Sequence, residues 1–368
     1  MKYIDEYRDP ALVRRLVSRI EEAAPRDGAP VKIMEVCGSH TQAIGRYGLR
    51  QMLPSRVRLI SGPGCPVCVT SVNDVDKALY LAGCSGIIFA TFGDMLRVPG
   101  TGEQSLQKIR ASGADVRVVA SARDCLTLAR ENPRREVVFL GIGFETTSPT
   151  VAATVREAQA REIGNFSVFS VHKVIPPAMY ALIADESLAI DGFLCPGHVS
   201  TIIGADAYRF VAEAGRAAVI TGFEPVDVLE GILMILLQIK EERPAVEIQY
   251  ARGVGPEGNV RAREILSSVF ETGAASWRGI GVIDESGLFF RKQYETFDAA
   301  RRFAIPEIAS EEITGCACGD ILRGAKTPPE CGLFGTRCSP RRPVGPCMVS
   351  SEGTCAAFYR YRSLQDPV

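Results

Sequence analysis

The stretches VKIMEVCGSHT (residues 31–41) and VRLISGPGCPVC (residues 57–68) each join a run of β-branched and apolar residues to a glycine-rich loop that carries cysteine. Such runs, with helical patterns between them, are typical of strands in a parallel sheet that is covered by helices. Because parallel strands end at the same edge of a sheet, the two loops are expected to lie close together. The sequence therefore predicts an α/β fold with a cysteine-bearing site at the strand ends.

The same alternation of apolar runs and helical patterns continues through the first two thirds of the chain. A longer amphipathic helix is expected at residues 226–241. The strands are expected at residues 31–36, 57–60, 86–91, 115–120, 136–140, 166–171, 192–195 and 217–221. We therefore expect two doubly wound parallel-sheet domains, the first over residues 1–140 and the second over residues 141–243.

The pattern changes after Pro244. A helix near residues 260–271 and strands at 279–283 and 287–291 indicate a smaller α+β domain over residues 244–368. Prolines in its last part exclude continuous helix or interior strand. That part also holds half of the chain's cysteines, namely Cys316, Cys318, Cys331, Cys338, Cys347 and Cys355. A bound metal is expected to order this cysteine-rich tail.

Composition and charge exclude several classes of protein. The 368 residues carry 42 basic and 43 acidic side chains, so a nucleic-acid partner is not expected. The charged first thirty residues lack the apolar core of a signal peptide. The longest apolar run, Gly231 to Leu237, falls far short of the ~20 residues that a membrane-spanning helix needs. We expect a cytoplasmic protein with no membrane partner, in which clustered cysteines are metal ligands or working thiols.

Cys65 and Cys68 form a Cys-Pro-Val-Cys pair that leads into an expected helix. Thiols at the start of a helix lie near backbone donors and the positive end of the dipole, which is expected to lower their pKa. The pair could serve as a reversible dithiol or as two ligands of a soft metal. Half of a zinc site is the structural alternative, but no second pair at matching spacing lies nearby.

Cys37 and His40 lie in the loop that follows the neighbouring strand. Cys37 is expected to join Cys65 and Cys68 in one site. His40 comes three residues after Cys37, a position that suits proton transfer or the orientation of a group held by the sulfur. A hydrogen-bonded loop histidine with no chemical role is an equal alternative.

Two further loops also directly follow expected strands, at residues 136–140 and 192–195. Residues 143–147 (GFETT) contain Glu145, and residues 196–199 (PGHV) contain His198. They could bring a carboxylate and a histidine to the cysteine loops across a cleft. The alternative is that the first loop only caps the next helix and that Glu145 is solvated. Three further cysteines lie in or beside apolar segments and are expected in the core: Cys84, Cys125 and Cys195.

The cysteine-rich tail favours an iron–sulfur cluster. Cubane clusters take four cysteine thiolates from irregular chain, whereas closed zinc sites favour short Cys-x-x-Cys hooks, which the tail lacks. Four ligands leave two cysteines over. Side chains in an extended Cys-x-Cys point to opposite faces, so one of Cys316 and Cys318 is expected outside the cluster. The spare pair could form a disulfide beside the cluster and receive its electrons one at a time.

Five features follow one another from about residue 30 to the C-terminus: CGSHT (37–41), GPGCPVC (62–68), GFETT (143–147), PGHV (196–199) and the six-cysteine tail. Together they resemble the HypD family of nickel–iron hydrogenase maturation factors. The resemblance implies a scaffold and redox carrier on which an Fe(CN)2CO centre is assembled and held transiently. An assembly scaffold with redox activity is expected rather than a stand-alone enzyme.

The resemblance also implies roles for single residues. Cys37 would be the principal ligand of the iron, with Cys65 and Cys68 as a nearby redox dithiol or as further ligands. The cleft would also be lined by His40, Glu145 and His198. In the tail, a 4Fe-4S cluster would be held by Cys316, Cys331, Cys338 and Cys355. The adjacent redox pair would be Cys318 and Cys347, and it would pass electrons from the cluster to the dithiol.

The implied partners are the small chaperone HypC, whose N-terminal cysteine would share the iron, and HypE with HypF as the cyanide donor. The residues alone leave two other functions open. One is an iron–sulfur dithiol oxidoreductase that acts on protein disulfides, suggested by the Cys65–Cys68 pair. The other is a non-redox protein whose tail is a zinc-bound structural cap.

Overall fold

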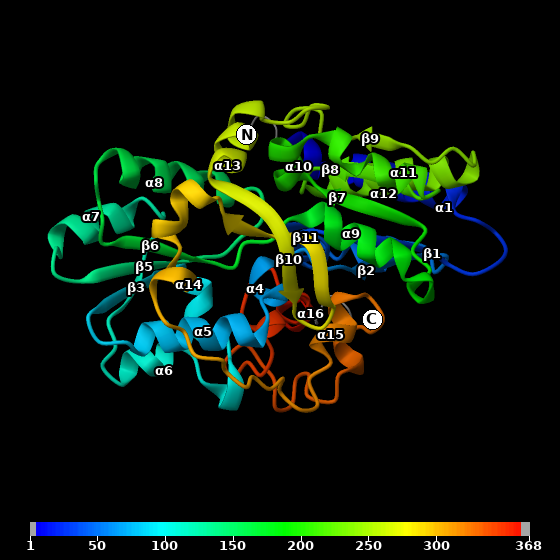
Figure 1. The fold of residues 1–368 in the computed structure, drawn as a ribbon. Helices are drawn as coiled ribbons and strands as arrows, with labels where there is room; N and C mark the ends of the chain where they lie inside the picture. Colours follow the sequence, from blue (N-terminus) through cyan, green and yellow to red (C-terminus); the bar gives the residue numbers. More distant parts are fainter. Residues whose placement is uncertain (1–4, 362–368) are drawn as a thin grey trace.

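Two parallel sheets form the body of the molecule in the computed structural model, which describes residues 5–361 (Figure 1). The first sheet has the strand order β2-β1-β7-β8-β9, and the second has the order β4-β3-β5-β6. The chain leaves the first sheet after β2, builds the whole second sheet, and returns with β7. The expected α/β class with two parallel sheets is therefore confirmed.

The strands are short and mostly buried, as expected for parallel sheets with helices on both faces. Those of the first sheet are β1 (Val31–Glu35), β2 (Val57–Ser61), β7 (Gly192–Pro196), β8 (Ala217–Thr221) and β9 (Val246–Ile248). Those of the second sheet are β3 (Ile87–Thr91), β4 (Val116–Val118), β5 (Glu136–Gly141) and β6 (Phe166–Ser170). In the first sheet β1 pairs with β2 on one side and with β7 on the other.

The helices follow the strands in the order that crossover connections require. In the first half they are α1 (Pro10–Ala23), α2 (Gly38–Arg46), α3 (Leu49–Met52), α4 (Pro66–Val69), α5 (Val72–Gly83), α6 (Leu106–Ala111), α7 (Asp124–Glu131) and α8 (Ser148–Ala160). In the second half they are α9 (Ile175–Ala184), α10 (Gly197–Ile203), α11 (Arg209–Glu213), α12 (Pro225–Lys240), α13 (Val260–Val269), α14 (Ala299–Arg302), α15 (Cys318–Leu322) and α16 (Thr354–Arg360).

The two sheets do not correspond to the ranges 1–140 and 141–243 expected from the sequence. β1 and β2 pair with strands that follow residue 190, whereas β6 closes the second sheet beside β5. Beyond residue 244, β9 joins the first sheet and α13 packs on α8. The pattern of apolar residues predicts where strands lie but not which strands pair. Dividing the chain into consecutive domains therefore could not predict that strands from distant parts of the sequence share one sheet.

Three groups of buried side chains hold the layers together. The largest group joins one face of each sheet to α5, α9 and the tail, and it includes Met34 and Phe193 from the first sheet, and Phe89 and Phe169 from the second. A second group fills the space between the second sheet and α7, α8 and α13. The third packs α1 and α12 against the other face of the first sheet. Each sheet is thus covered on both faces, as the doubly wound prediction requires.

A long antiparallel hairpin of β10 (Phe270–Trp277) and β11 (Gly281–Phe290) crosses the front of the molecule in Figure 1. Its strands differ from the expected pair 279–283 and 287–291, which together make β11. The Asp-Glu-Ser-Gly segment looks like a turn in sequence, but Glu285 takes a φ of 54° within the strand. The Trp277 indole donates a 2.8 Å hydrogen bond to Ser286, which keeps the strand paired through this irregularity.

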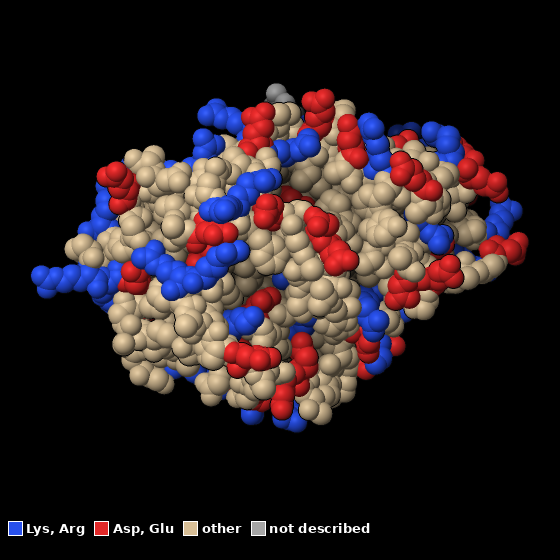
Figure 2. Space-filling view, in the orientation of Figure 1, with Lys and Arg blue, Asp and Glu red and all other residues tan. Residues whose placement is uncertain are grey.

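The cysteine-rich tail lies below this hairpin, with α15 near its beginning and α16 at its end (Figure 1). It contains the short 3-10 helices η7 (Pro328–Glu330) and η8 (Pro346–Met348), of which η8 contacts α4 while α16 packs on α2. Figure 2 shows acidic and basic side chains mixed over one face, in keeping with the net charge of -1. Within residues 5–361, none of the helices has the length and apolar character needed to cross a membrane.

Candidate functional site

Cys65 and Cys68 lie at the first turn of α4 as a close pair of thiols. Cys65 is the N-cap residue, Pro66 begins the helix, and the Cys68 amide donates to the Cys65 sulfur at 3.3 Å. The two Sγ atoms are 2.6 Å apart, and the residues are 4% and 0% exposed. Burial raises the pKa of Cys68 well above its usual value. The lowering expected from the helix is therefore wrong at Cys68, because a four-residue helix offers little dipole against full burial.

Cys37 is in backbone contact with the loop that carries this pair. The Gly38 amide donates a 2.9 Å hydrogen bond to the Gly64 carbonyl. A Cβ atom on Gly64 would collide with the backbone of Val36 and Cys37, so only glycine fits there. β1 and β2 pair directly, with Val31 opposite Val57. The prediction that the two cysteine loops lie together at one sheet edge is thus confirmed.

The Cys37 thiol sits at the N-cap of α2 and is 8% exposed. Burial raises the pKa of this thiol to about 12, and the negative charge of Glu352 acts in the same direction. Hydrogen bonds from the backbone of His40 and Ser39 and from the Ser39 side chain oppose this rise. The Ser39 hydroxyl also donates to Glu352 at 2.7 Å. Cys37 is therefore protonated in the free protein. The Ser39 hydroxyl and the Glu352 carboxylate beside it form a hydrogen-bonded route along which its proton could leave.

His40 is fully buried under the end of β8. Its Nε2 lies 2.9 Å from the Gly222 carbonyl oxygen, which fixes the proton on Nε2. Nδ1 then has a free lone pair and no hydrogen-bond partner. Burial lowers the pKa of His40 to about 4, so the ring is neutral at pH 7. The Nε2 hydrogen bond holds the ring as in an ordinary loop histidine, but Nδ1 remains available to accept a hydrogen bond.

His198 reaches the same region from the end of β7. Its ring stacks on Phe223 at a centroid distance of 4.0 Å, and His40 packs against Phe223 at 4.8 Å. Burial lowers the pKa of His198, whereas the charge of Glu352 raises it. The structure therefore brings His198 and His40 together around one aromatic ring on the Cys37 side.

Glu145 occupies a different place. Its carboxylate accepts a 2.9 Å hydrogen bond from the Ile175 amide at the start of α9, and its second oxygen has no partner. It is 3% exposed, and burial raises its pKa to about 7. No hydrogen bond joins it to Cys37 or His40 in the described residues. Glu145 is therefore not the solvated residue of the structural alternative, and the hydrogen bond from Ile175 joins it to α9 and not to the cysteine loops.

The six tail cysteines line one small cavity together with apolar side chains that include Leu333, Phe334 and Met348. Burial raises the pKa of Cys355, and Cys338, Cys316 and Cys331 raise it further because the four sulfurs are neighbours. The Cys338 sulfur accepts a 3.3 Å hydrogen bond from the Val344 amide. These four are the residues that the family resemblance assigns to a cluster.

Cys318 and Cys347 connect this cavity to the dithiol of α4. Their Sγ atoms are 2.9 Å apart and both residues are buried. Cys318 hydrogen-bonds to Cys316 on the cavity side, and Cys347 hydrogen-bonds to Cys68 on the other side. An unbroken series of sulfur contacts thus runs from the tail to Cys65.

The tail offers cysteine sulfur, a donor that both iron–sulfur clusters and zinc ions accept. Within residues 5–361, no three His, Cys, Asp or Glu side chains are arranged to hold a single metal ion. The tail sulfurs instead surround a cavity with an apolar wall. Four thiolates spaced around such a cavity are what a multinuclear cluster requires.

Sequence reasoning placed the other cysteines well but missed two residues of the site. Cys125 and Cys195 are fully buried, and Cys84 is half-buried with its thiol on the Tyr80 carbonyl. The missed residues are Phe223 and Glu352. Phe223 lies in a Gly-Phe-Glu triplet that echoes residues 143–145, and Glu352 precedes Cys355 by three residues. Neither signal could show that these side chains reach the Cys37 loop.

Comparison with known proteins agrees with the motifs. The family model described as "HypD: Hydrogenase formation hypA family" matches residues 11–362. The chain is 48% identical to the hydrogenase maturation factor HypD of Azotobacter vinelandii, over 98% of this chain and 97% of that protein. It is 48% identical to HypD2 of Bradyrhizobium diazoefficiens, over 100% and 98% of the two chains. It is 45% identical to HypD of Escherichia coli K12, over 98% of each chain.

Proposed function

Because the chain belongs to the HypD family, we propose that it acts in hydrogenase maturation as a scaffold on which an Fe(CN)2CO centre is assembled, with its sulfur groups supplying electrons. The iron centre is the cargo of this reaction. The proposal assigns the iron to Cys37 and the electron supply to the cysteine-rich tail. HypC, HypE and HypF are its proposed partners.

The observation that carries this function is the sulfur series. Cys318 and Cys347 lie between the tail cavity and Cys68, and Cys68 contacts Cys65. The Cys65 loop is in turn hydrogen-bonded to the Cys37 loop. A protein that holds an iron centre and also reduces it needs a continuous series of such contacts, because the electrons must reach the residue that binds the iron.

Cys37 suits an iron that carries cyanide and carbon monoxide. Such iron is a soft, low-spin centre, and thiolate binds it better than carboxylate does. The thiol must lose its proton when it binds a metal. Ser39 contacts the Cys37 sulfur and donates to Glu352, so this pair gives the departing proton a path toward solvent. The phenyl ring of Phe223 and the neutral ring of His40 make the surroundings of the Cys37 loop weakly polar.

In this proposal the tail holds a 4Fe-4S cluster through Cys316, Cys331, Cys338 and Cys355. When bound, the cluster supplies single electrons. The chain's own residues do the rest: Cys318 with Cys347 and then Cys65 with Cys68 store electrons in pairs as dithiols. The apolar wall of the cavity excludes water from the tail sulfurs.

The alternative of a general protein-disulfide oxidoreductase is disfavoured by burial. Attack on a partner's disulfide needs an accessible thiolate, yet Cys65 and Cys68 are 4% and 0% exposed. The raised pKa of Cys68, caused by its burial, further reduces its thiolate fraction. In our proposal Cys65 and Cys68 exchange electrons with other sulfur groups of the same protein, such as Cys347, and not with a partner's disulfide.

Infrared spectroscopy of protein purified without oxygen together with HypC tests the proposal. The parent protein should show cyanide and carbonyl stretching bands, which Cys37→Ala should lose while the iron–sulfur absorption of the tail remains. Cys84→Ala is the matched control, because Cys84 lies outside the site and should keep the bands. Bands that persist in Cys37→Ala would refute the assignment of the iron to Cys37.

A further inference from the structure

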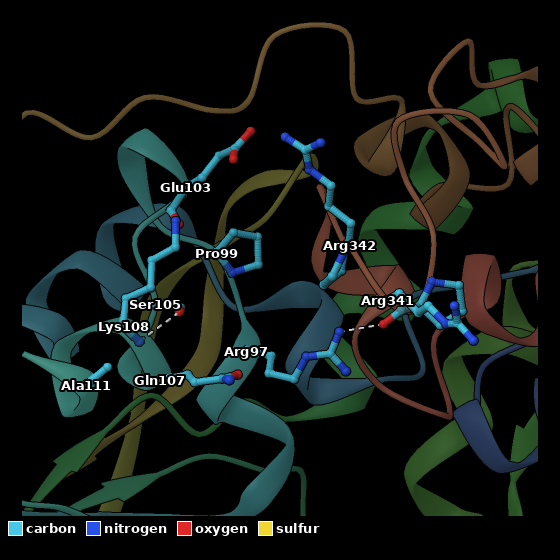
Figure 3. A pocket seen from close by; sticks show the side chains of 11 residues that line it. Arg97, Pro99, Glu103, Ser105, Gln107, Lys108, Ala111, Arg341 and Arg342 are labelled. Atoms are coloured by element: carbon cyan, nitrogen blue, oxygen red, sulfur yellow. Dashed lines mark hydrogen bonds between the residues drawn. The ribbon is translucent and has the colours of Figure 1, made fainter.

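A basic hollow lies between the second sheet's outer loops and the cysteine-rich tail (Figure 3). One wall comes from residues 97–111 and the other from residues 340–343. Its cationic side chains are Arg97, Lys108, Arg341 and Arg342. They are exposed, and Glu103 is the one acidic residue that lines the hollow.

None of these four cations forms an ion pair within the part of the chain that the structure describes. Arg97 donates to the Pro340 carbonyl, and Lys108 donates to the Glu103 backbone carbonyl at 2.6 Å. These four positive charges face a single acidic side chain, Glu103, in the lining of the hollow. Such a field attracts a negatively charged partner and speeds its association.

The turn that carries Arg341 and Arg342 is built directly on a tail cysteine. Ser339 and Arg342 exchange two backbone hydrogen bonds of 3.1 and 3.0 Å, which closes a rigid turn. Cys338 precedes the turn, and the Val344 amide, which follows it, donates to the Cys338 sulfur. The basic hollow therefore adjoins the segment that carries Cys338, one of the cysteines that line the tail cavity.

We propose that this basic hollow is the docking site of a small acidic one-electron carrier protein that reduces the tail cluster. The inference rests on the proposed function, since it requires the cluster. The occupant is a protein surface and not a small anion, because the four cations are exposed side chains on both walls of an open hollow. Docking here would bring the carrier to the turn that follows Cys338, one of the four cysteines that would hold the cluster.

The electrons balance in two encounters. Each reduced carrier would give up one electron by way of the cluster that Cys316, Cys331, Cys338 and Cys355 would hold, and would leave oxidised. Two such electrons, with two protons from solvent, would convert a Cys65–Cys68 disulfide into two thiols. Electrons would enter on the Cys338 side and leave through Cys347 to Cys68.

The test uses the full-length protein, reconstituted without oxygen, and reduced plant-type ferredoxin as the acidic carrier. Stopped-flow absorption gives the bimolecular rate of cluster reduction, and titration of oxidised ferredoxin gives the Kd. The double variant Arg341→Glu/Arg342→Glu should lower the rate at low salt at least about tenfold and weaken its salt dependence. Glu103→Lys should raise the rate. The double variant Arg15→Glu/Arg19→Glu, an equal charge change at two exposed residues of α1, should leave it unchanged.

Dithionite separates this inference from the proposed function. If dithionite reduces the cluster in every variant while ferredoxin reduces the parent and the double variant at equal rates, the docking site is refuted and the cluster stands. If no variant shows a reducible cluster, both proposals are overturned. Micromolar binding of inorganic phosphate in the hollow, with no binding of ferredoxin, would also overturn the docking proposal.

Discussion

The contact between the two cysteine loops can be tested with a single methyl group. Replacement of Gly64 by alanine adds a Cβ that would meet backbone atoms of Val36 and Cys37, which cannot rotate away as a side chain would. Either the two loops separate, and the 2.9 Å hydrogen bond from Gly38 to Gly64 is lost, or the strand ends shift. Overpacking of this kind costs about 1–3 kcal/mol, and a lost hydrogen bond adds about 1 kcal/mol. We therefore expect Gly64→Ala to lower the free energy of unfolding by about 2–4 kcal/mol.

Gly83→Ala is the matched control. Gly83 ends α5, and a Cβ there meets nothing within 4 Å. Alanine at that position should change stability by less than about 1 kcal/mol, in the stabilising direction. The urea midpoint of the two variants measures the difference, and mass spectrometry of iodoacetamide labelling reports on Cys37, which is 8% exposed in the parent. Equal midpoints, or unchanged labelling of Cys37 in Gly64→Ala, would refute the contact.

Three further predictions concern Glu145, whose carboxylate accepts from the start of α9, and two of the cysteines. Burial raises the pKa of Glu145 to about 7, above the ordinary value near 4.5. Its contribution to stability is therefore full below pH 4.5 and is lost as the pH rises through 7. Glu145→Gln should remove this pH dependence, which amounts to up to about 3 kcal/mol in the free energy of unfolding between pH 4.5 and 7, and an unchanged profile would contradict the burial effect. Cys331→Ala should speed proteolysis of the tail, because ligand loss removes the metal's part in folding, and cleavage at the parent rate counts against it. Cys65→Ala should keep the circular dichroism spectrum but fail to load iron with diatomic ligands, and normal loading would remove Cys65 from the mechanism.

The sequence predicted the strands of both sheets well because each is a short apolar run with β-branched residues. Val57–Ser61 and Ala217–Thr221 lie within a residue of the expected bounds. It also predicted that the Cys37 and Cys65 loops meet, since consecutive strands of a parallel sheet commonly pair. The assignment of strands to sheets could not be predicted, because pairing of β1 with β7 depends on contacts between residues about 160 positions apart.

Side-chain chemistry was harder to predict than position. The helix-based expectation of a low thiol pKa failed at Cys68 because burial outweighs a short helix, and burial is a tertiary property. Glu145 has the placement expected of a site residue but caps α9, whereas the carboxylate beside Cys37 comes from Glu352 in the tail. A local motif cannot reveal which distant side chain will fill the space next to it.

The interleaved order of the first sheet has a consequence for biosynthesis. The ribosome releases β1 and β2 long before β7, so the inner edge of β1 stays without its partner while the whole second sheet is made. Glu352, which accepts a hydrogen bond from Ser39, is made later still. The surroundings of Cys37 can therefore be completed only after residue 352 has been made, and a nascent chain would leave that thiol exposed to oxygen and stray metals until then.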